Sequence, residues 1–214
     1  MFMRKNQKTV LMAWAVTSIA AVLAVLTWLQ GVNWHISKAT SDLYQLFPLL
    51  GLLAFSVMWS HYIASVIRQQ MKVEKHILSQ YFELTSIVVL VAILLHPSLL
   101  WLQLWRDGLG LPPNSYLASY VDPALRWAAM LGTLCLLIFL AYELRRKFAV
   151  KNWWKYISYA SDFAMLAIFV HGAKLGRNLQ SGWFTYVWYF YGFTLIASLI
   201  YIHYQKYQRK AEAS

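Results

Sequence analysis

The chain has 214 residues, of which 60% are hydrophobic and only 13% are charged, and its net charge is +11. A soluble domain is about 45–50% apolar and about 25% charged, so this composition indicates a polytopic membrane protein. A single cysteine, Cys135, excludes an internal disulfide and a cysteine-based zinc or iron–sulfur site. The basic residues fall in the short gaps between apolar runs and form no single patch, which argues against a nucleic-acid partner.

Six apolar segments are long enough to span a bilayer, because a helix of about 20 residues crosses the roughly 30 Å hydrocarbon layer. They cover residues 9–30, 46–67, 77–101, 124–143, 153–171 and 183–203. The first is too long for the apolar core of a signal peptide, so we expect a retained anchor. We predict an all-α fold, a single domain over residues 1–214 built as a bundle of six transmembrane helices and arranged around the third. No soluble flavin or nucleotide domain and no internal repeat is expected.

Lysine and arginine are divided unequally between the two sides of this bundle. One side has fourteen: Arg4, Lys5, Lys8, Arg68, Lys72, Lys75, Arg145, Arg146, Lys147, Lys151, Lys155, Lys206, Arg209 and Lys210. The other side has five: Lys38, Arg106, Arg126, Lys174 and Arg177. The positive-inside rule places the richer side, and with it both termini, in the cytoplasm. We expect the protein in the cytoplasmic membrane of a prokaryote.

Two histidines close apolar segments on the same side of the predicted bundle. His96 lies 21 residues beyond Lys75, and His171 lies 20 residues beyond Lys151. At about 1.5 Å per residue, both are roughly 30 Å from the basic side. Two imidazoles at one depth on neighbouring parallel helices can bind both axial positions of a haem between them. The pattern leaves open a second interpretation, in which both histidines are interfacial residues at helix ends.

Residues near this pair fit the haem interpretation. Gly172 follows His171 directly and can let a porphyrin edge approach the backbone. Arg126, Lys174 and Arg177 lie on the same side and can pair with propionates. These residues complete the predicted cofactor site.

Three stretches of the chain, in their order and spacing, support the same interpretation. They are Leu-Leu-Gly-Leu-Leu-Ala-Phe at 49–55, Leu-Leu-His-Pro-Ser-Leu-Leu at 94–100, and Trp-Trp-Lys-Tyr-Ile through Val-His-Gly at 153–172. With the basic run at 145–147, they make residues 45–200 resemble the ferric reductase-like transmembrane domain family. This family includes the membrane halves of ferric reductases and NADPH oxidases and the haem subunit of periplasmic methionine sulfoxide reductases. The resemblance implies that His96 and His171 are the axial ligands of an outer haem b.

The chain departs from this family at the inner haem. Family members often carry a second histidine 13 or 14 residues earlier in each of the two segments, where this chain has residues near Phe82 and Ser158. We therefore expect one haem b and no FAD or NAD(P) site. The electron donor is then expected to be a quinone near the haem, or a partner such as a flavoprotein or a periplasmic or extracellular redox protein.

A second group of polar residues falls in the inner half of the segments. Glu83 and Asp162 are acidic, and a charge at mid-span costs about 2.5–3.5 kcal/mol on insertion scales. At about 100° per residue, Asp162 lies roughly 180° from His171 and Glu83 roughly 140° from His96, so neither shares the ligand face. With His61 they form a hypothetical inner cluster, either a proton path or a second site. Hydrogen bonding between helices, including Ser158 and Ser161, is the alternative.

Two functions follow from these observations. The first is a membrane b-type cytochrome that transfers electrons through one bis-histidine haem, as an oxidoreductase component without its own soluble catalytic domain. The alternative is a haem-free scaffold, assembly factor or small transporter on the same six-helix fold.

Overall fold

The computed structural model describes residues 2–31, 41–115, 122–148 and 154–212, so Lys38 and Lys151 lie outside the described residues. These ranges are mostly helical and contain no strand, which confirms the predicted all-α class. The helices are α1 (Phe2–Gly31), α2 (Ser41–Gln70), α3 (Ser79–Arg106), α4 (Arg126–Phe148), α5 (Trp154–Leu175), α6 (Arg177–Gln180) and α7 (Trp183–Ala211). Short 3-10 turns at Lys75–Leu78 and Pro123–Leu125 precede α3 and α4.

Each of the six predicted segments overlaps one long helix, and most of these helices extend beyond the predicted segment. α3 continues through Pro97 to Arg106, and α7 continues to Ala211. Five helices are long and apolar enough to cross a membrane, namely those in Arg4–Gly31, Gln45–Gln70, Lys75–Arg106, Pro123–Glu143 and Trp183–Arg209. The exception is α5, which is 22 residues long but carries Ser158, Ser161 and Asp162 in its first half.

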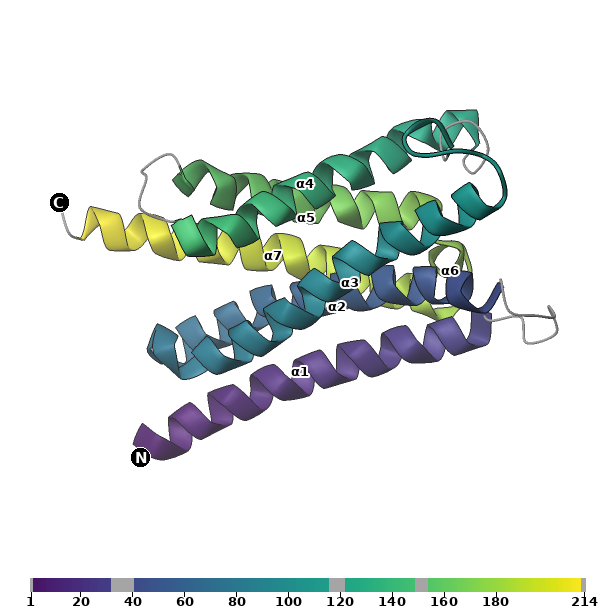
Figure 1. The fold of residues 1–214 in the computed structure, drawn as a ribbon. Coiled ribbons are helices and arrows are strands. Elements are labelled where there is room, and N and C mark those ends of the chain that lie inside the picture. Colours follow the sequence, from purple (N-terminus) through teal and green to yellow (C-terminus); the bar gives the residue numbers. More distant parts are fainter. Residues whose placement is uncertain (1, 32–40, 116–121, 149–153, 213–214) are drawn as a thin grey trace.

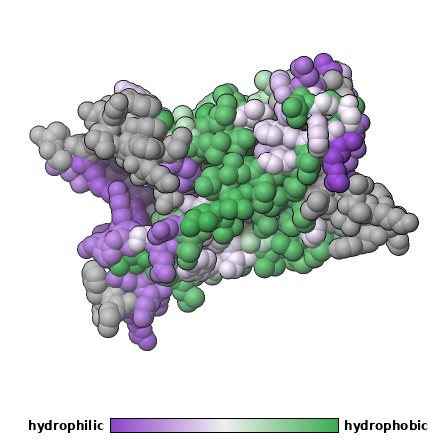
Figure 2. All heavy atoms as spheres, viewed as in Figure 1, coloured by the Kyte–Doolittle hydropathy of each residue, from purple (hydrophilic) through white to green (hydrophobic). Residues whose placement is uncertain are grey.

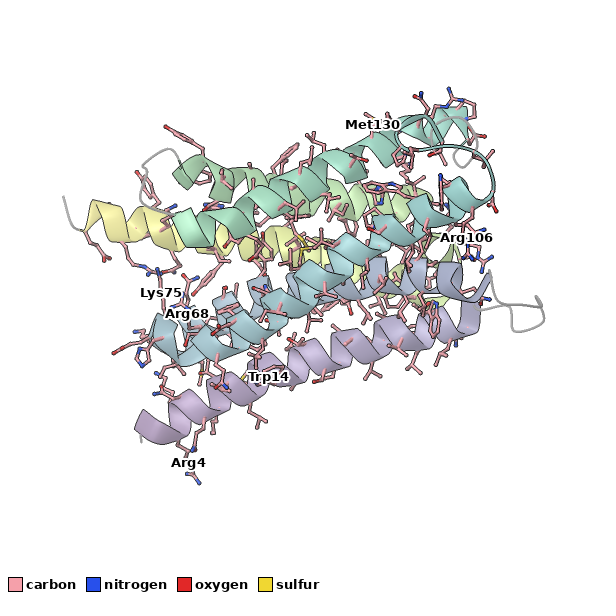
Figure 3. All side chains as sticks on the ribbon, viewed as in Figure 1. Arg4, Trp14, Arg68, Lys75, Arg106 and Met130 are labelled. Atoms are coloured by element: carbon pink, nitrogen blue, oxygen red, sulfur yellow. The ribbon has the colours of Figure 1, made fainter. Side chains whose placement is uncertain are left out.

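The long helices lie side by side, and the start of α1 and the end of α7 are at the same end of the bundle (Figure 1). Arg4, Arg68 and Lys75 are at this end, which we call the basic end, and Arg106 is at the opposite, far end (Figure 3). Figure 2 shows a hydrophobic band across the middle of the visible face, with hydrophilic residues at both ends. Such a band is what a surface in contact with lipid requires.

The bundle consists of two antiparallel hairpins, with two further helices beside them. α2 packs along α3, α4 packs along α5, and both α1 and α7 pack on α2. Half of the apolar stretch of α2 is buried, compared with 22% of that of α3. The central helix is therefore α2, and the prediction that the bundle is arranged around the third segment was wrong in this respect.

Aromatic rings from α2 and α7 fill the space between the hairpins. Phe55 packs on Trp188 and Trp59 packs on Tyr191, with ring centroids 4.2 Å apart in each pair. The indole of Trp59 also donates a hydrogen bond to Thr194 at 2.9 Å. Because both hairpins contribute to the same buried cluster as α7, this aromatic core fixes their relative positions.

Candidate functional site

A cavity of about 450 Å³ lies between the two hairpins, toward the far end of the bundle. Cofactor and small-molecule sites commonly occupy about 300–1,000 Å³, so its size is adequate for a bound cofactor. Its walls are mostly apolar and come from all seven of the described helices, with Leu52, Phe55, Leu100, Leu136, Phe139 and Trp188 among them. Five of the chain's nine glycines also line it, which leaves room where larger side chains would fill the space.

His96 reaches this cavity from α3 and is held there by α2. Its Nδ1 lies 2.7 Å from the backbone carbonyl oxygen of Phe47. The ring of Phe47 stacks on the imidazole, with centroids 4.1 Å apart and planes inclined by 8°. One neighbouring residue therefore fixes both the direction and the plane of the His96 ring.

His171 is held in the same manner in the other hairpin. Its Nδ1 lies 2.7 Å from the backbone carbonyl oxygen of Ala128 on α4. Both histidines line the one cavity. The structure therefore brings together the two residues that helical rise and spacing had paired, although His96 is ten residues before the end of α3 and His171 only four before the end of α5.

These two hydrogen bonds determine the tautomer of each ring. A carbonyl oxygen can only accept, so Nδ1 must carry the proton in both histidines. In the neutral ring Nε2 then has a free lone pair, which is the form that binds a metal ion. Within the described part of the chain, neither Nε2 has a hydrogen-bond partner. This arrangement, with one nitrogen held by a carbonyl and the other available, is typical of histidine ligands of metals.

The polar side chains at the cavity differ from those expected. Arg177 lines it and donates from Nη2 to the Gly31 carbonyl of α1. Arg126 and Lys174 are exposed and are not among the described residues that form its wall. Gly172 does line the cavity, but the side on which a Cβ would project is filled by Trp188, 2.6 Å away. Gly172 therefore provides space for that indole, and Arg177 is the cation of the predicted set placed for a carboxylate in the cavity.

The two histidines also determine which kind of metal centre the cavity can hold. Among the described residues no group of three or more His, Cys, Asp and Glu side chains could hold a metal ion. A protein-bound zinc ion usually takes three or four protein ligands, so two imidazoles alone make a poor site for a bare ion. Haem iron takes four ligands from its porphyrin and needs only the two axial ones. The residues present therefore fit a haem.

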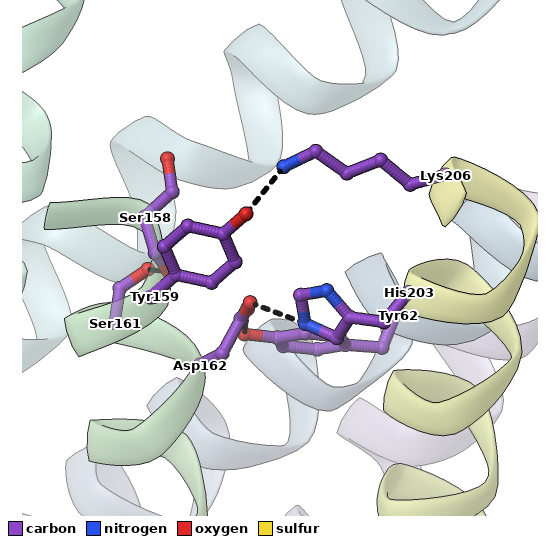
Figure 4. A network of polar contacts seen from close by, with 7 residues as sticks. All are labelled: Tyr62, Ser158, Tyr159, Ser161, Asp162, His203 and Lys206. Atoms are coloured by element: carbon purple, nitrogen blue, oxygen red, sulfur yellow. Dashed lines mark hydrogen bonds and ion pairs between the residues drawn. The ribbon is translucent and has the colours of Figure 1, made fainter. Parts of the chain in front are cut away.

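The predicted inner cluster is not assembled as expected. Asp162 accepts a hydrogen bond from the Tyr62 hydroxyl at 3.0 Å and pairs with Nε2 of His203 at 3.1 Å (Figure 4). His61 instead contacts Thr85 on α3, with Nε2 and Oγ1 2.7 Å apart, and Glu83 is exposed. Asp162 thus connects α2, α5 and α7, whereas His61 and Glu83 belong to another face of the bundle.

This polar group, which we call the Asp162 network, continues toward the basic end. Tyr159 stacks on His203 with ring centroids 5.7 Å apart, and Lys206 donates to the Tyr159 hydroxyl at 3.1 Å. Ser161 donates at 2.9 Å to the Ser158 carbonyl of its own helix, so it makes no bond between helices through that hydroxyl proton. Sequence analysis missed His203 because the sixth predicted segment, 183–203, ends at this residue, whereas α7 runs on to Ala211.

Comparisons with protein-family models, curated proteins and solved structures found no match for this chain. The resemblance to the ferric reductase-like family, the haem and its redox role therefore stay predictions. The geometry of the cavity and its two histidines is independent of that resemblance.

Proposed function

We propose that this protein is a membrane b-type cytochrome with one haem held between His96 and His171. The observation that supports it most is the matched pair of imidazoles, each fixed through Nδ1 to a backbone carbonyl and each lining the same cavity. When bound, haem supplies a one-electron carrier whose potential depends on its axial ligands and on burial. The proposed role is electron transfer as a component of an oxidoreductase system.

The chain's own residues have distinct tasks in this proposal. His96 and His171 bind through Nε2, and their carbonyl partners keep the two rings in a fixed orientation. The apolar walls exclude water, which stabilises a neutral environment around the iron. Arg177 pairs with a propionate where the cavity meets α1 and α6.

The proposed orientation of the protein in the membrane follows from the distribution of its basic residues. The start of α1 and the end of α7 lie at the basic end, where Arg4, Arg68 and Lys75 are also found. By the positive-inside rule, this end is proposed to face the cytoplasm of a prokaryotic cell. The haem site then lies toward the outer face of the membrane. In the family that the chain resembles, a second haem is often bound at the inner level, where this chain has Phe82, whose ring packs against His61. The proposed donor is therefore a quinone near the site or a partner protein.

The test is a reduced-minus-oxidised absorption spectrum of the purified protein, expressed in cells that supply haem, with haem per chain quantified. We expect about one low-spin haem b per chain, and loss of that spectrum in His96→Ala and in His171→Ala. His76→Ala is the matched control, since His76 is exposed and pairs with Glu74 at 3.0 Å. Free imidazole added to either ligand variant should restore the spectrum if only the ligand was lost.

Absence of haem from the wild-type protein would contradict the proposal and favour the haem-free scaffold or transporter. Equal haem content in all three variants would show that haem binds elsewhere. Circular dichroism of each variant shows whether the helical fold is retained.

A further inference from the structure

The two hairpins contain the same arrangement around their histidines. In the first, the carbonyl of Phe47 accepts from His96, and Gly51 follows four residues later on α2. In the second, the carbonyl of Ala128 accepts from His171, and Gly132 follows four residues later on α4. The two hairpins therefore share one arrangement of histidine, backbone carbonyl and glycine.

The spacing of four has a physical reason. In an α-helix the carbonyl of residue i already accepts from the N–H of residue i+4, and it retains a second lone pair. Side chains tilt toward the helix N-terminus, so the side chain of residue i+4 covers the carbonyl of residue i. A glycine at i+4 leaves that carbonyl open to a donor from a neighbouring helix.

Distances show that the histidines use this opening. A Cβ atom built on Gly51 would lie 2.8 Å from Cε1 and 3.1 Å from Nδ1 of His96. A Cβ atom built on Gly132 would lie 2.5 Å from Cε1 and 2.6 Å from Nδ1 of His171. Real Cβ atoms essentially never approach another heavy atom within 3.0 Å, so alanine at either position must displace the imidazole.

We propose that Gly51 and Gly132 are positioning residues, whose missing side chains allow each histidine to reach its carbonyl and so direct Nε2 into the cavity. For haem binding this inference rests on the proposed function. The hydrogen bonds themselves are a property of the protein without a ligand and can be tested separately.

Gly192 provides a matched control for substitutions at these glycines. It lies inside α7, and a Cβ atom there would meet the ring of Phe169 at 2.5 Å, so alanine imposes a similar steric conflict with an aromatic ring. Gly192 does not belong to the described wall of the cavity. Gly192→Ala therefore measures the cost of a tight helix contact at a ring that is not a hydrogen-bond partner of either histidine.

The first measurement is a haem titration of the haem-free protein and of the variants Gly51→Ala, Gly132→Ala and Gly192→Ala. Loss of the hydrogen-bond partner of a metal ligand typically costs about 10–100-fold in affinity, so we expect at least about tenfold weaker binding in the first two variants. We also expect an altered electron paramagnetic resonance spectrum, because the imidazole planes rotate. Binding equal to that of Gly192→Ala in both variants would overturn the inference.

The second measurement needs no haem, so it separates failure of this inference from failure of the proposed function. Histidine side-chain 15N spectra report which ring nitrogen carries the proton. We expect Gly51→Ala to change the His96 signals and Gly132→Ala to change those of His171, with Gly192→Ala affecting neither. Unchanged histidine signals in folded Gly51→Ala and Gly132→Ala would overturn the inference even if haem binds.

A third variant adds no bulk and covers the case in which an alanine variant does not fold. Ala129→lactic acid converts the Ala128 carbonyl into an ester carbonyl, which is a weaker acceptor. It should shift the same His171 signals as Gly132→Ala and leave those of His96 unchanged. No shift at His171 would show that the carbonyl does not set the orientation of this ring.

Discussion

Removal of the Asp162 carboxylate should destabilise the bundle, because this one side chain joins three helices. It accepts from Tyr62 of α2 at 3.0 Å and pairs with His203 of α7 at 3.1 Å, while its own helix is α5. α5 is long enough to cross a membrane but is not among the helices that are apolar enough to do so. Specific polar contacts are therefore expected to contribute to its position.

The expected magnitude follows from the two hydrogen bonds. Interhelical hydrogen bonds in membrane proteins average about 0.6 kcal/mol and reach about 1.7 kcal/mol, so Asp162→Ala should cost about 1–3 kcal/mol. The side chains of Asp162 and His203 are 27% and 40% exposed, so solvent screening favours the lower half of this range. Asp162→Asn keeps an acceptor for Tyr62 and should cost about half as much.

The assay is reversible unfolding in bicelles, with a double-mutant cycle between Asp162→Ala and His203→Ala. We expect a coupling energy of about 0.5–1 kcal/mol for this pair. Glu212→Ala is the control, because Glu212 is an exposed carboxylate beyond the last candidate span and its loss should change stability by less than about 0.5 kcal/mol. Equal destabilisation by Asp162→Ala and Glu212→Ala, or a coupling energy near zero, would refute the reasoning.

Two further predictions concern other parts of the bundle. Thr17 contacts Ser60 at 2.8 Å and Tyr81 at 2.7 Å in a buried cluster of α1, α2 and α3. Thr17→Val should therefore destabilise the protein by about 0.5–1.5 kcal/mol in the same unfolding assay, and a smaller effect than that of Glu212→Ala would contradict this. Arg177→Ala should weaken haem binding and shift the midpoint potential of the haem, whereas Lys174→Ala should do neither, because of these two residues only Arg177 lines the cavity. Equal effects of the two substitutions in a redox titration would argue against Arg177 as the partner of a propionate.

The secondary structure was predictable because each apolar run is long and bounded by basic or aromatic residues. The same hydropathy could not reveal which helix is central. Lipid is as apolar as a helix interface, so the side of α3 facing lipid and the buried side of α2 are similar in composition. The prediction therefore placed the third segment at the centre, where the structure has α2.

The candidate site was predictable in part. The positions of His96 and His171 along their segments were enough to pair them, because helical rise converts residue number into depth. The acceptors Phe47 and Ala128 were not predictable, since backbone carbonyls leave no residue-type signal. One signal was present and missed: Leu-Gly occurs at 50–51 and again at 131–132, with a leucine two residues later in each case.

The partner of Asp162 was missed for a different reason. An acidic residue in a span requires a partner, and the cluster predicted for Asp162 comprised His61 and Glu83. His203 was not included, because it is the last residue of the predicted segment 183–203. The helix continues for two further turns, which brings His203 into the bundle beside α5.

Each histidine finds its carbonyl within its own hairpin, and this has a consequence for how the bundle is assembled. His96 can be oriented as soon as α2 packs on α3, and His171 as soon as α4 packs on α5. Neither step requires the other hairpin. A ligand bound to both rings then bridges two halves that were shaped separately, and its binding free energy adds to the association of those halves. By mass action a ligand at 100 times its Kd contributes about 2.7 kcal/mol in this way. A haem bound at the proposed site would therefore stabilise the contact between the two hairpins in addition to its proposed role in electron transfer.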